Sequence, residues 1–71
     1  MNDNKGLPTV AEALEEIRTK PLVNLWPTVG VAYGVSRGAI YDAAARGEIE
    51  VIGIGRLRKA VTASLRRKLG I

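Results

Sequence analysis

The pattern of apolar and polar positions predicts a helix near the start of the chain. Apolar side chains recur at a spacing that places them on one helix face: Val10, Ala13, Leu14 and Ile17. Thr9 and Glu12 have the spacing of a capping box, in which each side chain bonds the backbone N–H of the other residue. Pro21 ends the pattern, because proline disfavours helical backbone at the residue before it. We therefore expect a helix over residues 9–19.

The next segment, residues 20–27, is a connector that contains two prolines. Its apolar side chains are too numerous for a free linker: Leu22, Val23, Leu25 and Trp26. We expect this segment to lie against the core, with Trp26 buried there. Pro27 stands at a first helical position, where its fixed backbone angle suits a helix. It predicts a second helix over residues 27–33, which Gly34 ends.

A third helix is predicted after a short turn. Ser36 is a suitable N-terminal cap and Gly47 a suitable C-terminal end for a helix over residues 37–46. Two helices joined this tightly need a glycine in the turn and a small residue where they cross, which Gly30 provides. The apolar positions of such a motif are also occupied: Val29, Tyr33, Val35, Ile40 and Ala43. This register favours a DNA-binding helix-turn-helix over residues 26–46; the alternative is an ordinary helical hairpin.

A β-hairpin is predicted behind this motif. A strand-like run of β-branched residues comes first: Ile49, Val51, Ile52 and Ile54. Gly55-Arg56 is a two-residue turn with glycine first. The turn sets two cross-strand pairs: Ile54 with Leu57, and Ile52 with Lys59. A hairpin over residues 50–60 would form the wing of a winged helix-turn-helix, in which a basic tip touches phosphates or the minor groove.

The chain is expected to close with one more helix. Thr62 is a suitable cap for a helix within residues 62–69, whose two leucines are four residues apart. The predicted fold is mainly α with a small β-hairpin, a winged helix-turn-helix in the order α-α-α-β-β-α. We expect a single domain over residues 1–71, in which the helix over residues 9–19 is accessory to the DNA-binding motif.

Positive charge is concentrated toward the C-terminus. The formal net charge is +4. Residues 1–50 carry five basic and seven acidic side chains, whereas residues 51–71 carry six basic side chains and no acidic one. A basic segment of this kind favours a polyanionic partner, such as nucleic acid or an anionic membrane surface. The alternative is a basic helix end that only faces water.

The composition excludes several kinds of chemistry. The chain has no His and no Cys, so it lacks imidazole and thiolate metal ligands, disulfides and the commonest general base. Tyr33 or Tyr41 could in principle be a recombinase nucleophile, but a chain of 71 residues without His cannot assemble the activating groups. We therefore expect no enzymatic activity and no cofactor, metal or small-molecule ligand.

No membrane or secretory segment is predicted. The polar first residues are not followed by an apolar stretch, and no stretch approaches the roughly 18 apolar residues of a transmembrane helix. We expect the protein to act in the cytoplasm, without a membrane partner.

The sequence resembles a known family in its central part. Residues 33–49, YGVSRGAIYDAAARGEI, and the Ile-Gly-Arg of residues 54–56 are similar to the excisionase-type winged helix-turn-helix family, which is related to the DNA-binding part of MerR regulators. The resemblance covers about residues 25–66. It implies a phage-encoded or mobile-element protein that bends attachment-site DNA in a bacterial host and assists a separate integrase. Such proteins often bind cooperatively as adjacent monomers.

Three positions depart from the family pattern. The second wing strand begins with Leu57 and basic residues, where an aromatic residue is common. Gly30 stands where alanine is usual, and lowers helix propensity by about 1 kcal/mol. Asp42 lies on the predicted recognition helix where a basic residue is frequent, so it could repel a phosphate or accept a hydrogen bond from a cytosine amine.

The candidate DNA contacts form three groups. The recognition helix supplies Ser36, Arg37, Tyr41 and Arg46. The wing supplies Arg56, Arg58 and Lys59. The C-terminal helix supplies Arg66, Arg67 and Lys68, which could instead face water. Arg37 is the strongest candidate for reading a base, since arginine pairs with guanine through two hydrogen bonds. Arg56 is placed to reach the minor groove, while Tyr41 could contact DNA or cover the edge of the core.

The leading hypothesis is a sequence-specific, DNA-bending recombination directionality factor. Its partners would be double-stranded DNA at an attachment site and a phage integrase. The alternative is a small phage transcriptional regulator of the MerR-like type, and a third class is a protein-interaction module that uses the first helix and the connector. The acidic side chains of the first helix could dock on a neighbouring copy's basic C-terminal segment: Glu12, Glu15 and Glu16. This favours head-to-tail self-association on DNA.

Overall fold

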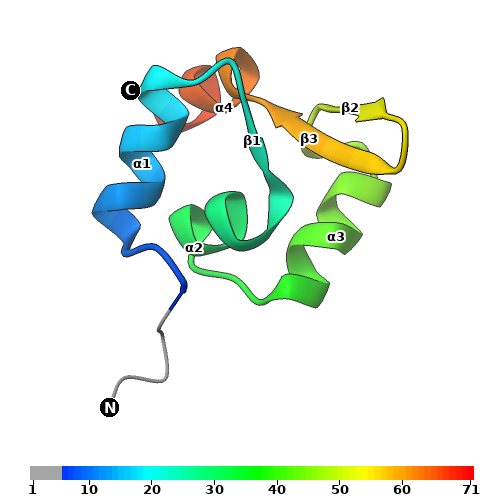
Figure 1. The fold of residues 1–71 in the computed structure, drawn as a ribbon, viewed down its shortest axis with the longest axis horizontal. Helices are drawn as coiled ribbons and strands as arrows, with labels where there is room; N and C mark the ends of the chain where they lie inside the picture. Colours follow the sequence, from blue (N-terminus) through cyan, green and yellow to red (C-terminus); the bar gives the residue numbers. More distant parts are fainter. Residues whose placement is uncertain (1–5) are drawn as a thin grey trace.

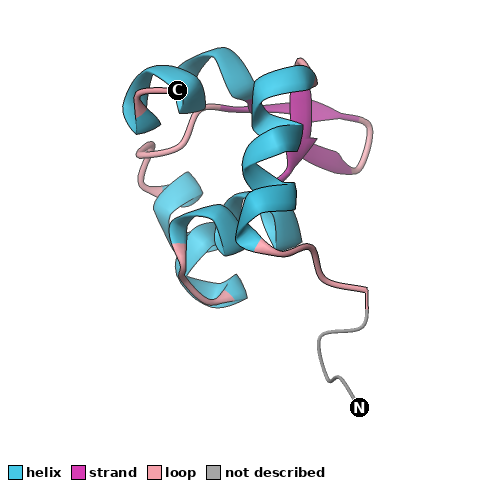
Figure 2. Cartoon of the chain, turned by 90° about the vertical axis from the view of Figure 1, so that its left-hand side faces the viewer, coloured by secondary structure: helices cyan, strands magenta, loops and turns pink. Residues whose placement is uncertain are grey.

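The computed structural model describes residues 6–71, which form a small α/β domain with a three-stranded antiparallel sheet (Figure 1). The elements follow in the order α1 (Val10–Thr19), β1 (Leu22–Asn24), η1 (Leu25–Val29), α2 (Gly30–Tyr33), α3 (Arg37–Ala45), β2 (Val51–Ile54), β3 (Leu57–Val61) and α4 (Thr62–Leu69). The strands lie at one side of the molecule and the helices make up the rest (Figure 2). None of the helices within residues 6–71 is long and apolar enough to cross a membrane.

The predicted element order was incomplete, because the connector contains a strand. In β1, Leu22 lies opposite Val61 and Asn24 opposite Lys59, so β1 pairs antiparallel with β3. Strand β3 also pairs with β2 and is therefore the central strand. Three residues are too few to show the alternation that identifies a strand. The partner of β1 is also remote in the sequence, so no local pattern could indicate the pairing.

Helix α1 begins as predicted and belongs to the core. The Thr9 hydroxyl accepts a hydrogen bond from the Glu12 backbone N–H at 3.1 Å, and the Glu12 carboxylate accepts from the Thr9 N–H at 2.8 Å, which confirms the capping box. Ala13 and Ile17 are fully buried. They lie on the side of α1 that contacts α2 and α4. The helix therefore supports the rest of the fold.

The two helices of the predicted helix-turn-helix are present. The first consists of η1 and α2: Trp26 is in extended backbone (φ −128°, ψ 132°), a cis peptide bond joins it to Pro27, and the chain then winds into α2. Gly34 ends α2 with a positive φ of 74°, as predicted. The Ser36 hydroxyl accepts from the Ala39 N–H at 3.2 Å, which confirms Ser36 as the cap of α3.

The hairpin has the predicted register. Ile54 lies opposite Leu57 and Ile52 opposite Lys59. Gly55 has a positive φ of 59°, a conformation that a tight turn requires and that residues with a Cβ rarely adopt.

Thr62 does not cap α4, contrary to the prediction. Val61 occupies the cap position, and Thr62 is the first residue of the helix and is fully buried. Its hydroxyl donates toward the backbone carbonyl oxygens of Lys20 and Pro21, at 2.8 Å from the latter. Arg66 donates to the same hydroxyl at 3.2 Å and to the Ile17 carbonyl at 2.9 Å. These bonds fasten α4 to the end of α1 and the start of β1.

One hydrophobic core joins these elements, and α2 and β2 contribute only partly buried side chains to it. Its buried members come from the other helices, from two strands and from the loop after α3: Ile17, Val23, Leu25, Val29, Ile40, Ala44, Ile49, Ala60 and Leu65. Trp26 and Tyr33 are only partly buried and pack against it. Val35, which the motif placed among its apolar positions, is exposed. The core leaves one face of α3 and the end of the hairpin free.

Gly30 is explained by its neighbour Trp26. A Cβ atom at residue 30 would lie 2.4 Å from Cε3 of the Trp26 ring, closer than two carbon atoms can approach. We expect Gly30→Ala to destabilise the protein by about 1–3 kcal/mol, because overpacking outweighs the gain in helix propensity. Urea unfolding measures this change, and the emission of Trp26, the single tryptophan of the chain, reports the displaced ring.

Gly38 provides the matched control. It also lies in a helix, but a Cβ there would meet no atom within 4 Å. Gly38→Ala is therefore expected to stabilise the protein by about 0.5–1 kcal/mol. A stabilised Gly30→Ala variant would contradict the assigned contact.

Candidate nucleic-acid interface

A notch between the wing and α3 brings together residues from both predicted DNA-binding elements. Its volume is about 250 Å³. The lining comes from the end of β1, from η1, from α3 and from the wing: Asn24, Leu25, Trp26, Tyr41, Arg56, Leu57 and Arg58. The notch exists because β1 is shorter than β3. The last residue of β1, Asn24, pairs with Lys59, so Leu57 and Arg58 of β3 have no partner in β1.

Arg37 extends the notch toward the start of α3. Its guanidinium carbon lies 5.9 Å from the centre of the Tyr41 ring, one helical turn away, within the range of a cation–π contact. Both side chains are exposed. The contact orients the guanidinium and leaves its N–H groups available, because none of them is bonded to any residue between 6 and 71. Ser36 lies next to Arg37 at the N-terminus of α3, where backbone N–H groups favour an anion.

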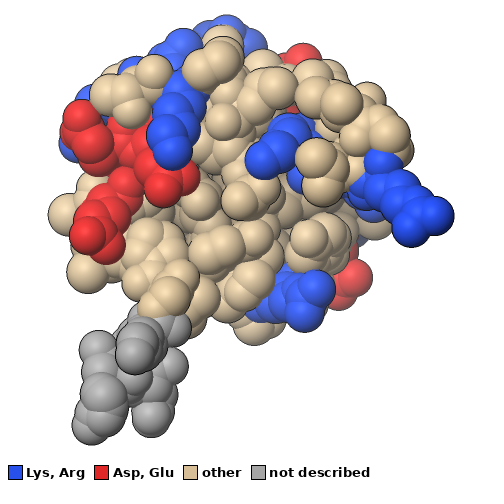
Figure 3. Space-filling view, viewed as in Figure 1, with Lys and Arg blue, Asp and Glu red and all other residues tan. Residues whose placement is uncertain are grey.

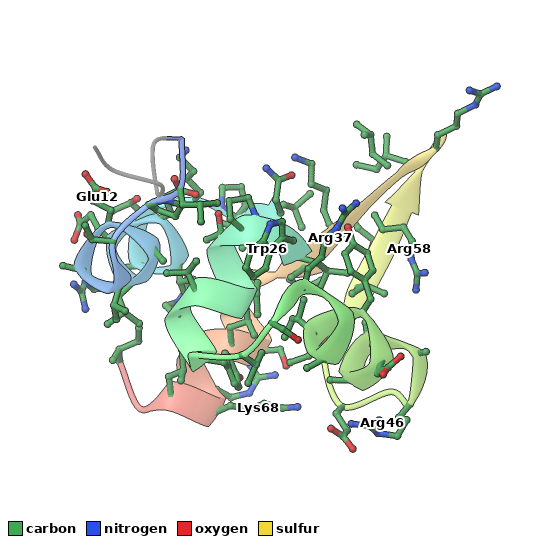
Figure 4. All side chains as sticks on the ribbon, turned by 90° about the horizontal axis from the view of Figure 1, so that it is seen from below. Glu12, Trp26, Arg37, Arg46, Arg58 and Lys68 are labelled. Carbon is green, nitrogen blue, oxygen red and sulfur yellow. The ribbon has the colours of Figure 1, made fainter. Side chains whose placement is uncertain are left out.

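Arg56 and Arg58 are the free cations of the wing. Neither side chain forms a hydrogen bond or an ion pair with any part of the chain that the structure describes. Side chains alternate along a strand, so Arg58 lies on the same face as the buried Ala60, which is the face toward the helices. Figure 4 shows Trp26, Arg37 and Arg58 along one side of the molecule.

Lys59, the third predicted wing residue, points to the opposite face of the hairpin. Its ammonium donates to the Asn24 side-chain oxygen at 2.7 Å. This bond crosses from β3 to β1 and holds the lysine at the outer face of the sheet. Lys59 is therefore separate from the notch that contains Arg56 and Arg58.

Arg46 is also away from the notch. Its guanidinium forms two hydrogen bonds with the Glu48 carboxylate, at 2.9 and 3.2 Å. These bonds and the attraction between the charges raise the pKa of Arg46 and lower the pKa of Glu48, so both groups are charged at neutral pH. In Figure 4, Arg46 and Lys68 lie on the side opposite Arg37 and Arg58. The pair is a nearly neutral group at the exit of α3.

The three basic residues of α4 have different environments. Arg66 is half-buried and bonded to the Ile17 carbonyl and the Thr62 hydroxyl, so it stabilises the fold. Lys68 donates to the backbone carbonyl of Glu48. Arg67 is exposed and bonds to no residue within the described range. Of this group, only Arg67 has a fully available side chain.

Most of the acidic side chains gather at one end of the molecule. In Figure 3 they lie over α1 at the left of the view, with basic side chains beside and above them, while further basic side chains lie over the wing end at the right. Part of the acidic charge is already paired within the chain: Glu15 with Arg18 at 3.4 Å, and Glu16 with Lys20 at 4.0 Å. Glu16 also accepts from the Thr28 hydroxyl at 3.1 Å. The notch is therefore remote from the main acidic surface.

Trp26 is a residue of the interface that was not predicted from the sequence. We expected its side chain in the core, whereas the ring lies partly exposed over Gly30 and lines the notch. The only signal in the sequence was the placement of a tryptophan between an asparagine-leucine pair and a proline, which does not indicate its neighbours.

A second cavity lies on the other side of α3 and is mostly apolar. Its volume is about 370 Å³, and Tyr33, Ile40 and Leu69 contribute to its lining. The Tyr33 hydroxyl oxygen is buried and has no hydrogen-bond partner within residues 6–71. Burial raises the pKa of Tyr33 above its usual range, so this hydroxyl stays protonated at neutral pH.

Comparisons of the chain with protein-family models, with curated proteins and with solved structures find no match.

Proposed function

We propose that this protein is a sequence-specific, DNA-bending excisionase that assists a phage integrase. The observation that carries the proposal is the notch, in which Tyr41 of α3 meets Arg56 and Arg58 of the wing. In a winged helix-turn-helix, the recognition helix enters the major groove and the wing contacts phosphates or the minor groove. A DNA strand between the two grooves would then lie in this notch.

The availability of the basic side chains supports the same interface. Within residues 6–71, no residue bonds the N–H groups of Arg37, Arg56 and Arg58, which lie along one side, whereas Arg46 and Arg66 are bonded to other residues. In this proposal Arg37 reads a base edge in the major groove, Arg58 binds a phosphate, and Arg56 reaches the minor groove. Ser36 adds a backbone contact at the start of α3, whereas Lys59, which is bonded to Asn24 on the opposite face of the hairpin, lies outside this interface. The chain acts through binding alone, without catalysis or a cofactor.

The salt dependence of DNA binding is the first test. About five phosphate contacts predict a slope of roughly −4.5 for log K against log salt concentration. We expect this slope for a 30-base-pair duplex of random sequence, measured by fluorescence anisotropy over a range of salt concentrations. Arg58→Ala should make the slope less negative by about 0.9, the contribution of one phosphate contact.

Arg18→Ala is the matched control for this measurement. It removes the same charge from the exposed side of α1, where Arg18 is paired with Glu15. Its slope should equal that of the wild type. A wild-type slope near zero would refute DNA binding, and equal effects of the two substitutions would refute the notch as the site.

Recombination separates the excisionase from a transcriptional regulator. An integrase from the same genetic element should excise its DNA efficiently only when this protein is added. Footprints should cover adjacent sites in the same orientation, bound cooperatively by copies that associate head to tail. Excision that is independent of the protein, together with a footprint on an inverted repeat in a promoter, would identify a regulator.

A further inference from the structure

The wing carries an exposed apolar surface that the fold does not explain. Ile52, Ile54 and Leu57 are 41%, 51% and 58% exposed, and they belong to the few large apolar side chains that residues 6–71 leave open to water. Ile54 and Leu57 are cross-strand partners directly beside the turn. Ile52 is two residues from Ile54 and so lies on the same face. We call these three residues the apolar wing surface, and none of them is among the buried residues of the core or the partly buried residues packed against it.

Charge restricts what can cover this surface. Arg56 lies in the turn between Ile54 and Leu57, and Arg58 and Lys59 follow directly. The hairpin from residue 51 to residue 61 contains no acidic side chain. This apolar pair has the unpaired Arg56 in the turn between its two members and Arg58 on the other face of the hairpin, and it fits a surface that is negatively charged outside and apolar inside. The minor groove of DNA has these properties, with phosphates at its edges and stacked bases at its floor.

We propose that Ile54 and Leu57 act as a wedge that enters the minor groove and partly unstacks one base step. The inference rests on the proposed function and adds how the DNA is bent. Minor-groove proteins that insert apolar side chains kink the duplex by about 20–90°. Arg56 and Arg58 would hold the phosphates on either side of the opened step, and the unpaired edge of β3 at the notch gives the hairpin tip room to approach.

The wedge can be tested apart from DNA binding. The probe is a duplex selected from a random pool, carrying a fluorescent dye at each end and 2-aminopurine at successive positions. With wild-type protein at saturation, we expect energy transfer to increase as the ends approach. We also expect 2-aminopurine fluorescence to increase at one step, where stacking is lost. The double variant Ile54→Ser/Leu57→Ser should bind with the wild-type salt slope but lose both signals.

Val10→Ser is the control, because Val10 is also 51% exposed but lies at the start of α1, away from the hairpin. It should keep both signals, and urea unfolding should show that both variants are folded. A double variant that still bends and unstacks the duplex would overturn the wedge and leave the proposed function intact. Loss of cooperative binding with the bend retained would also overturn it and would assign the surface to a protein contact. If the wild type fails to bind any duplex, the proposed function itself fails.

Discussion

Arg37→Ala is expected to weaken binding to the preferred DNA site by roughly 5- to 150-fold, which corresponds to about 1–3 kcal/mol. Under the proposal, Arg37 would make two hydrogen bonds to a guanine edge, and a loss of this size follows from their removal. The guanidinium carbon of Arg37 lies 5.9 Å from the centre of the Tyr41 ring, and this contact orients the guanidinium in the absence of DNA. Selection from a random DNA pool should show relaxed preference at one or two base pairs, and anisotropy should measure the loss of affinity.

Arg56→Ala is the comparison variant, which separates a loss of sequence preference from a general loss of affinity. Arg56 lies in the turn of the wing and contacts no base edge in the major groove under the proposal. Its replacement should weaken binding to preferred and random duplexes by similar factors, while the selected sequence stays the same. If both variants lose sequence preference equally, α3 is not the reading element.

Leu65→Ala should have the largest effect on stability, about 2–5 kcal/mol. Leu65 is almost fully buried in α4 and belongs to the same core as Ile17 of α1 and Ala60 of β3. Removal of its side chain leaves a cavity where these elements meet. A chain this short has a stability of only a few kcal/mol, so the variant should be largely unfolded at 25 °C. Circular dichroism during urea unfolding measures the change.

Leu57→Ala serves as the control in this experiment. Leu57 is the same residue type but lies on the apolar wing surface, where its side chain is mostly exposed. We expect a change within about 0.5 kcal/mol, as for other exposed positions. Equal destabilisation by the two substitutions would contradict the assignment of Leu65 to the core and Leu57 to the surface.

Local patterns predicted much of this fold. The Thr9–Glu12 capping box, the Ser36 cap and the Ile54–Leu57 pair all depend on residues within four positions of each other, and each is present. In such cases the energetics of one turn or one helix end decide the structure. The sequence therefore predicted where the helices and the hairpin lie, and which basic residues belong to α3 and the wing.

Features that depend on distant residues could not be predicted in this way. Strand β1 exists because β3 offers it a free edge 35 to 39 residues later. Thr62 has the residue type of a helix cap, but its backbone N–H and its hydroxyl both donate to the carbonyl of Pro21, which is remote in the sequence, so the predicted cap was wrong. Trp26 lines the notch because Gly30 leaves room for its ring. Arg46 lies at the end of α3, close to where the sequence placed the end of this helix, but its guanidinium is hydrogen-bonded to Glu48.

The bonds between α4 and the α1–β1 region affect the order in which the protein can fold during synthesis. Arg66 bonds the Ile17 carbonyl across 49 positions, and Thr62 bonds the Lys20 carbonyl across 42. Helix α1 leaves the ribosome before the other elements, but its packing against both α2 and α4 is complete only when α4 has emerged. We therefore expect nascent chains that stop before residue 62 to remain open and sensitive to protease. The domain would become resistant in one step, after its last helix is released.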